Sequence, residues 1–272
     1  YAWGTLEHDF SAATMARAIV SYTDVASHRE GEVDDPGNTV GEADDKRHYD
    51  VFAVKLDGSH RTERWLHQFG LEWRTMAADY DYRSRSILSP GYPAPQSPGS
   101  EVTRDETPSP SGNHVAAYVT SRVLVTDRLA AELGLRWDEQ TYGVDADDQW
   151  GPRVNLAYEL GDATRLRASW GRYQQFQGIN ELQVEDGIDE FQRAQVADHA
   201  ILGLEQTLPA GTSRRVEAYR KDYRRLMARY ESLYDPLSLV PELRWDRVRI
   251  APDDARAEGV ELLLTRRSEA PW

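Results

Sequence analysis

The sequence predicts an all-β fold: an antiparallel up-and-down transmembrane β-barrel, partial, with about eleven strands of a larger barrel and long loops on one side. Three observations predict it. Hydrophobic and polar residues alternate with a period of two, and the connections between the alternating stretches are short and long in turn. The clearest stretch, residues 129–137, also matches the length of about 9–11 residues that a tilted bilayer-crossing strand needs. No apolar run reaches about 18 residues, so a transmembrane helix is not predicted.

The alternation is strongest in the middle of the chain. In residues 129–137 the odd positions are apolar and the even positions are mostly polar or small, which in a strand places the two sets on opposite faces. Further strands are predicted at residues 3–10, 14–22, 50–57, 65–73, 115–125, 154–160, 166–170, 200–208 and 259–265.

The connections place the long loops at one end. Short connections fall at residues 11–13, 57–63, 126–127, 161–163 and 209–212, and long ones at 26–48, 79–111, 142–151, 174–198 and 227–255. Alternate connections of a meander lie at the same end, as in outer-membrane barrels with short turns on one side. The long segments at 26–48 and 79–111 are rich in acidic residues, Gly or Pro, so we expect solvated loops there.

Charge and composition exclude several classes of protein. With 32 basic and 46 acidic residues the net charge is −14, which argues against a nucleic-acid partner. The absence of cysteine excludes disulfides and thiolate chemistry. The sequence starts without Met or a signal peptide, and we expect it to be part of a longer chain.

One segment is ambiguous by periodicity. Between residues 213 and 235, apolar and aromatic side chains recur at spacings of three and four, as in a basic amphipathic helix, which could bind a membrane surface or a partner. A strand reading instead places Glu217, Tyr219, Lys221 and Tyr223 on one face. Periodicity alone leaves both interpretations open.

Five motifs in order resemble the TonB-dependent outer-membrane receptors, in the C-terminal half or so of their 22-stranded barrel. They are Gly151-Pro152-Arg153-Val154-Asn155-Leu156-Ala157-Tyr158, Leu166-Arg167-Ala168-Ser169-Trp170-Gly171-Arg172, Gly178-Ile179-Asn180-Glu181-Leu182, Glu217-Ala218-Tyr219-Arg220-Lys221-Asp222-Tyr223 and Ala257-Glu258-Gly259-Val260-Glu261-Leu262. The resemblance covers about residues 134–266, and it favours a strand over a helix at 213–235.

The resemblance implies a single domain over residues 1–272, a partial receptor barrel without a plug domain. The sequence departs from the family where Gln177-Gly178-Ile179 replaces a frequent Pro, and it lacks the final aromatic-ended strand. An odd strand count also predicts a partial barrel, because single-chain bacterial barrels have even numbers, and such a piece cannot transport by itself.

Candidate site residues follow from the loops and from the polar strand faces. We expect ligand-facing side chains in residues 142–150, 174–198 and 227–251; the named candidates are Tyr142, Trp150, Tyr173, Gln174, Gln175 and Asn180. Charged groups are costly on the lipid face, so we expect a lumen-facing ladder of paired polar side chains, consisting of Glu132, Arg136, Arg153, Asn155, Glu159, Arg165 and Arg167. Aromatic residues at strand ends, among them Trp137, Tyr158 and Trp170, suit the membrane interface.

No catalytic motif, metal site or cofactor is predicted. His60 and His67 flank a predicted turn and are expected to be surface or lumen residues, and Asp145, Asp147 and Asp148 fit a solvated acidic loop better than a Ca²⁺ site.

The resemblance implies a non-enzymatic receptor in the outer membrane of a Gram-negative bacterium, surrounded by outer-membrane lipid. It would take up a siderophore, cobalamin or glycan, driven by the TonB system through a plug domain missing from this chain. The alternatives are an outer-membrane β-barrel enzyme, which would need catalytic residues converging at one rim, and a soluble β-rich binding protein.

Overall fold

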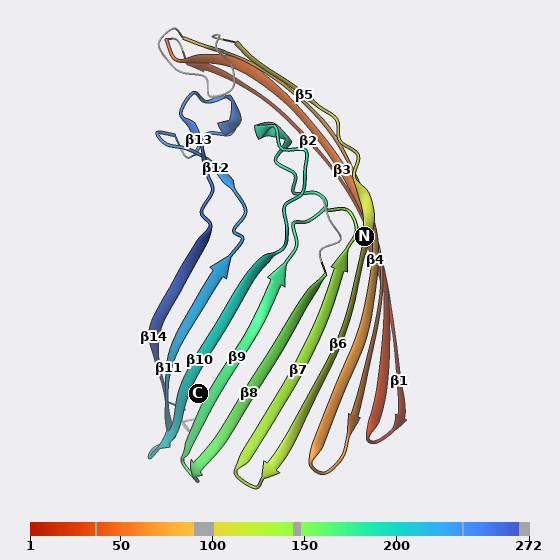
Figure 1. Cartoon of the computed structure of the whole chain (residues 1–272), viewed down its shortest axis with the longest axis vertical. Coiled ribbons are helices and arrows are strands. Elements are labelled where there is room, and N and C mark those ends of the chain that lie inside the picture. Colours follow the sequence, from red (N-terminus) through yellow and green to blue (C-terminus); the bar gives the residue numbers. More distant parts are fainter. Residues whose placement is uncertain (36, 90–100, 144–147, 236, 267–272) are drawn as a thin grey trace, which may run out of the picture.

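The computed structural model describes residues 1–35, 37–89, 101–143, 148–235 and 237–266. Most of its strands form one curved antiparallel sheet (Figure 1). Its strand order is β1-β2-β3-β4-β6-β7-β8-β9-β10-β11-β14, with β5 paired to the outer part of β4. The sheet strands are β1 (Ala2–Ser11), β2 (Thr14–Asp35), β3 (Thr39–Arg61), β4 (Trp65–Leu88), β5 (Glu101–Glu106), β6 (Ser111–Thr126), β7 (Leu129–Gln140), β8 (Gln149–Gly161), β9 (Thr164–Gln175), β10 (Gln195–Leu208), β11 (Thr212–Arg224) and β14 (Asp254–Arg266). The eleven consecutive strands confirm the predicted meander, and the open sheet is consistent with a partial barrel.

The β1–β2, β3–β4, β6–β7, β8–β9 and β10–β11 turns lie at one end of the sheet. The β9–β10 and β11–β14 connections lie at the other end, together with the tip of the β2–β3 hairpin (Figure 1). The short turns are local structures: Thr126 Oγ1 accepts hydrogen bonds from the backbone N–H groups of Arg128 and Leu129 at 3.2 and 3.0 Å, and closes the β6–β7 turn. In the β10–β11 turn, Ala210 and Gly211 both take positive φ, as tight hairpin turns require.

Three strands are much longer than predicted. β2, β3 and β4 have 22, 23 and 24 residues, and β2 and β3 stay in register from the Thr14↔His60 pair to the Asp35↔Thr39 pair. The expected loop at 26–48 is therefore wrong: it is a strand hairpin that extends beyond the predicted membrane span. Residues 79–88 of the next expected loop also belong to β4. Both faces of these extensions are polar or mixed, so the apolar–polar alternation that reveals the other strands is absent. We call residues 26–35, 39–48 and 77–88 the wall.

The two longest connections are folded segments. The β9–β10 loop (residues 176–194) contains a short 3-10 helix, η1 (Val184–Asp186), and the β11–β14 loop (residues 225–253) contains the hairpin β12 (Arg229–Ser232)–β13 (Arg247–Ile250) with η2 (Pro241–Leu243). Residues 212–224 form a strand, which rules out a helix there. Within the described residues, no helix has the length and apolar character to cross a membrane.

The main buried cluster lies where these loops pack on the wall. Tyr80 and Tyr82 of β4 are 3% and 0% exposed, and they pack with Leu182 and Val184 of the β9–β10 loop and Leu243 of the β11–β14 loop. The remainder of the sheet has no comparable cluster among the described residues, because a single sheet layer leaves its other face uncovered.

Candidate ligand-binding site

The two faces of the sheet differ in chemistry. We call the face covered by the β9–β10 and β11–β14 loops the inner face, and the opposite one the outer face. Directly paired residues of neighbouring strands share a face. On this basis Tyr80, Glu132 and Asn155 lie on the inner face, while Leu133 and Leu156 lie on the outer face, where they are 60% and 42% exposed.

The predicted polar ladder residues all lie on the inner face, and most of them are paired. Glu132 accepts hydrogen bonds from Arg122 Nε at 2.8 Å and from Asn155 Nδ2 at 3.0 Å. Arg165 and Glu159 are joined at 2.5 Å, and Arg167 lies 3.2 Å from Glu205.

The remaining two ladder residues lie higher on the same face. Arg136 Nη2 lies 2.6 Å from Asp138, and the guanidinium of Arg153 lies over the ring of Tyr173, 4.7 Å from its centroid. The first contact lies within β7, and the second is a cation–π contact between the paired strands β8 and β9.

The six ligand-facing candidates do not form one site. Tyr173 and Gln175 lie on the inner face, and Asn180 is exposed in the β9–β10 loop. Trp150 and Gln174 lie on the outer face, where the Gln174 amide donates to the Trp150 carbonyl at 2.8 Å.

Tyr142 has a packing role. Its ring meets Phe191 edge-on at 5.0 Å between centroids, and its hydroxyl donates to the Gln177 carbonyl at 2.8 Å. Burial raises the pKa of Tyr142 to about 12, so its hydroxyl stays protonated and can donate at neutral pH.

Partly buried ion pairs hold the two long loops against the wall. Arg29 of β2 pairs with Glu242 of the β11–β14 loop at 2.6 Å, and Arg47 of β3 pairs with Glu185 of the β9–β10 loop at 2.6 Å. Asp45, which is 5% exposed, contacts both arginines at 3.1 and 2.8 Å. Burial alone would lower the pKa of Arg47, but Asp45 and Glu185 outweigh it and raise that pKa.

Two further contacts complete this loop cluster. The Tyr80 hydroxyl donates to the Ile179 carbonyl at 2.8 Å and accepts from the Leu182 N–H at 3.2 Å; burial raises its pKa to about 12. Arg247 of β13 joins Asp186 of η1 through two contacts of 2.6 Å and so connects the two loops.

Sequence reasoning did not find most of the wall residues, because it assigned residues 26–48 and 79–111 to loops. A signal exists: in residues 79–86, charged Asp or Arg occupies the odd positions, while Tyr or Ser occupies the even positions. This is a period of two in which the inner set is uncharged and the outer set is charged.

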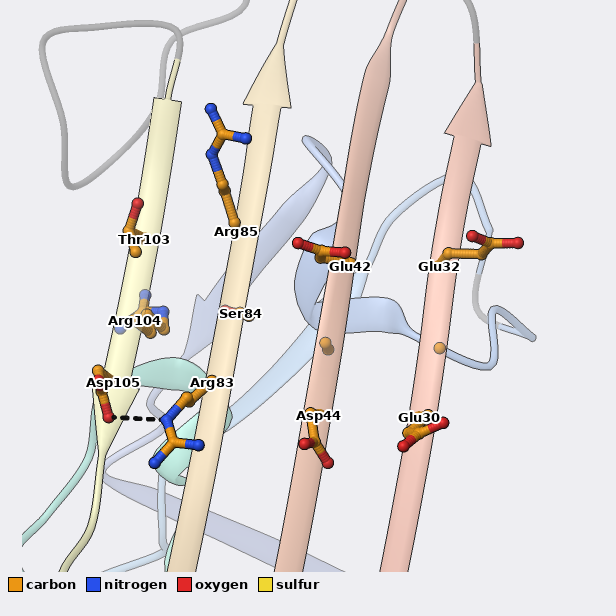
Figure 2. Close-up of a pocket in the computed structure, with 12 residues that line it drawn as sticks. Glu30, Glu32, Glu42, Asp44, Arg83, Ser84, Arg85, Thr103, Arg104 and Asp105 are labelled. Carbon is orange, nitrogen blue, oxygen red and sulfur yellow. Dashed lines mark ion pairs between the residues drawn. The ribbon is translucent and has the colours of Figure 1, made fainter.

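The outer face of the wall carries a cavity of about 650 Å³. Figure 2 shows Glu32 and Glu42 on β2 and β3 beside Arg85 on β4, with the loops behind the strands; Arg83 and Asp105 are joined at 3.6 Å. The acidic strands lie next to a strand of arginines, so this cavity is a charged surface outside the loop cluster.

Histidines and carboxylates form local pairs. The ligand atoms of His28, Glu30 and Asp44 lie within 4.8 Å of one another on the outer face, and Asp44 is also joined to Lys46 at 2.7 Å. His60 and His67 face each other across β3 and β4, yet each ring bonds a different hydroxyl, at 2.8 and 2.9 Å. The expected acidic loop at Asp145 and Asp147 lies outside the described residues.

A second cavity, of about 370 Å³, lies between the two long loops. It is bounded by polar amide side chains rather than by the arginines of the wall. Its lining residues are Gln175, Gln177, Glu181, Gln183, Gln192, Gln195, Met227, Ala228 and Arg229.

An antiparallel meander with an apolar outer face, a polar inner face and loops at one end defines an outer-membrane barrel. The family model of the TonB dependent receptor-like β-barrel matches residues 2–272, and the chain belongs to that family. It is an outer-membrane protein of a Gram-negative bacterium. No curated protein matches the sequence.

Solved structures of receptors and transporters share the fold. The ferripyoverdine receptor of Pseudomonas aeruginosa is 15% identical, with 99% of this chain and 38% of that one covered at a TM-score of 0.58. The copper transporter OprC is 14% identical (98% and 44% covered, TM-score 0.60), and the ferric-catecholate import receptor Fiu of E. coli K12 is 13% identical (96% and 43% covered, TM-score 0.59). The chain spans less than half of each of these proteins.

Proposed function

We propose that this chain is the ligand-receiving part of an outer-membrane receptor that takes up a scarce nutrient, a siderophore, cobalamin or glycan, with TonB-derived energy. The observation that carries the proposal is the loop cluster: two long loops fold over the polar inner face and are held there by ion pairs such as Arg29–Glu242 at 2.6 Å, in which the Glu242 carboxylate is 1% exposed. Breaking such a pair would leave a desolvated carboxylate without its partner, so these contacts favour one defined arrangement of the rim.

The chemistry of the two faces supports their orientation in this proposal. The outer face exposes large apolar side chains, including Leu133, Leu135 and Trp170, and it would meet lipid. The inner face, with the ladder from Glu132 to Arg167, would line the interior of a closed barrel. Tyr173 and Gln175 at its upper end would meet a ligand, whereas Trp150 and Gln174 face the other way and are not part of this proposed site.

Energy coupling and cargo are inferred from the family and the fold. The family is TonB-dependent, and the similar structures are a ferripyoverdine receptor, a copper transporter and a ferric-catecholate import receptor. Coupling would act through a plug domain, which is distinct from the barrel domain that the family model matches over residues 2–272.

Growth under nutrient limitation tests the proposal. A strain lacking the gene, a strain lacking tonB and the parent would be compared on ferric siderophores, cobalamin and oligosaccharides at limiting concentration. We expect the gene and tonB to be required for growth on the same nutrient, and a plasmid copy of the gene to restore growth in the first strain only. Growth of both deletion strains on every nutrient, equal to the parent, would contradict the proposal.

A further inference from the structure

The cavity between the two long loops is lined by five glutamine side chains. Its volume of about 370 Å³ is at the small end of the range for ligand pockets, about 300–1,000 Å³. Gln175 and Gln195 come from paired positions at the ends of β9 and β10, and Gln183 and Gln192 come from the loop between these strands. The pocket therefore opens beside the inner face, at the rim where a ligand would arrive.

Three of the glutamines hold the walls of the pocket in place. Gln177 donates to the Glu181 carbonyl at 2.8 Å and accepts from the Gln192 N–H at 3.0 Å. The side-chain oxygens of Gln192 and Gln195 accept from the N–H groups of Ala228 and Met227 at 3.3 and 3.4 Å. Because backbone N–H groups can only donate, these contacts fix the amide orientations and leave the NH₂ groups of Gln192 and Gln195 available to a ligand.

Two glutamines can offer a ligand both the NH₂ group and the carbonyl oxygen of the side-chain amide. Gln175 and Gln183 make no side-chain hydrogen bond within the part of the chain that the structure describes, and each offers a donor and an acceptor. A hydroxyl group, which both donates and accepts, is the matching ligand group.

The charges at the pocket are already engaged. Arg229, the lining cation, lies 2.6 Å from Glu231, and the Glu181 carboxylate accepts from the Gly178 N–H at 2.7 Å. An anionic ligand would thus meet the carboxylate of Glu181 without an unpaired cation among the described lining residues to offset the repulsion. A neutral ligand meets no such cost.

We propose that this glutamine pocket binds an uncharged ligand rich in hydroxyl and carbonyl oxygens, either a carbohydrate or a neutral amide- or hydroxamate-bearing chelate, and discriminates against anionic chelates. The inference rests on the proposed receptor function and narrows its substrate class. Gln175 and Gln183 provide the main contacts, and the amides of Gln192 and Gln195 supply further donors.

Calorimetric titration of the receptor purified from outer membranes tests the pocket. The probes are maltose, cellobiose, ferrichrome and cyanocobalamin as uncharged ligands, and ferric enterobactin as the anionic one. We expect an uncharged probe to bind, and the double variant Gln175→Leu/Gln183→Leu to weaken that binding about tenfold or more, since two hydrogen-bonding amides are lost. The identity of the bound probe separates the carbohydrate source from the chelate sources.

Two further variants serve as controls for this experiment. Gln68→Leu, at an exposed β4 position near the short-turn end, is the matched control and should bind as the parent does. Gln175→Glu/Gln183→Glu preserves side-chain size, so it retains the fold if leucine does not, and it should weaken binding of the same probe.

Several results would overturn the inference: binding of ferric enterobactin alone, binding of none of the uncharged probes, or unchanged affinity in the double variants. Failure of the pocket differs from failure of the receptor function. TonB-dependent growth on an anionic chelate would retain the receptor and exclude the pocket chemistry, whereas growth independent of the gene and of tonB would exclude both.

Discussion

At the scale of single residues, hydroxyl groups in the loop cluster differ sharply in their roles. The Tyr80 hydroxyl bridges the Ile179 carbonyl and the Leu182 N–H, and so connects a wall strand to the β9–β10 loop. Tyr82, two positions further along the same face, is 0% exposed, and its hydroxyl has no hydrogen-bond partner among the described residues. A buried polar atom without a partner stabilises nothing, whereas a bridging one satisfies two backbone groups.

This contrast predicts different outcomes for the same substitution at two neighbouring sites. Tyr80→Phe leaves the Ile179 carbonyl and the Leu182 N–H without their hydrogen-bond partner. We expect it to lower the opening free energy of the β9–β10 loop by about 1–3 kcal/mol. Tyr82→Phe removes an unpartnered hydroxyl, and it should be neutral or slightly stabilising. Hydrogen exchange of residues 176–194 measures both effects, and equal loss of protection in the two variants would refute the assigned roles.

At the scale of elements, the strands that the sequence reveals are those with one apolar face. Residues 129–137 are evident because Leu133 and Leu135 are exposed on the outer face while Glu132 is paired on the inner face. The extension of β2 is not evident, since Arg29 on one face and Glu30 on the other are both charged, and alternation then carries no hydrophobic signal. A β-ribbon that is surrounded by water can carry polar side chains on both of its faces.

The candidate site was predictable only in part, for a related reason. Tyr173 and Gln175 could be located from strand periodicity and loop position, because a strand end determines which face a side chain takes. Convergence of Gln183, Gln192 and Met227 depends on how two loops, far apart in sequence, pack against each other. No local pattern encodes that packing.

The contact between the loops gives a prediction at this scale. Arg247 holds Asp186, which is 5% exposed, with two parallel contacts of 2.6 Å, a geometry that the single ammonium of lysine does not reproduce. Arg247→Lys should therefore lower the local opening free energy of the β12–β13 hairpin by about 1.5–3 kcal/mol. Arg249→Lys, at an exposed position of the same strand, should have no effect. Hydrogen exchange of residues 229–232 and 184–186 provides the readout, and identical protection in both variants would contradict the role given to Arg247.

At the scale of the whole molecule, the fold separates two solvents. Strands β6–β11 and β14 carry apolar side chains on the outer face and paired polar side chains on the opposite, inner face. The charged wall on β2–β4 extends beyond this part of the sheet. Since all long connections lie on the wall side, the polarity of the molecule along the strands is fixed by its topology.

The assignment of the faces to lipid and to the barrel interior can be tested with one residue type placed on either side. Leu133→Lys would put a charge on the outer face, and we expect it to destabilise the receptor by about 2–4 kcal/mol in lipid. Asn155→Lys, on the inner face beside Glu132, should form an ion pair in place of the present hydrogen bond and change stability little. Urea unfolding in lipid vesicles measures the difference, and a larger loss for the inner substitution would reverse the assignment.

The wall also limits which parts of the rim can move. A ribbon of three strands with unbroken ladders bends only as a unit, and it is rooted in the strands below. Opening or closing of the entrance to the barrel interior must then come from the two long loops, which move relative to the rigid wall. Such motion would break contacts at Arg29, Arg47 and Tyr80 while it leaves the strands themselves undisturbed.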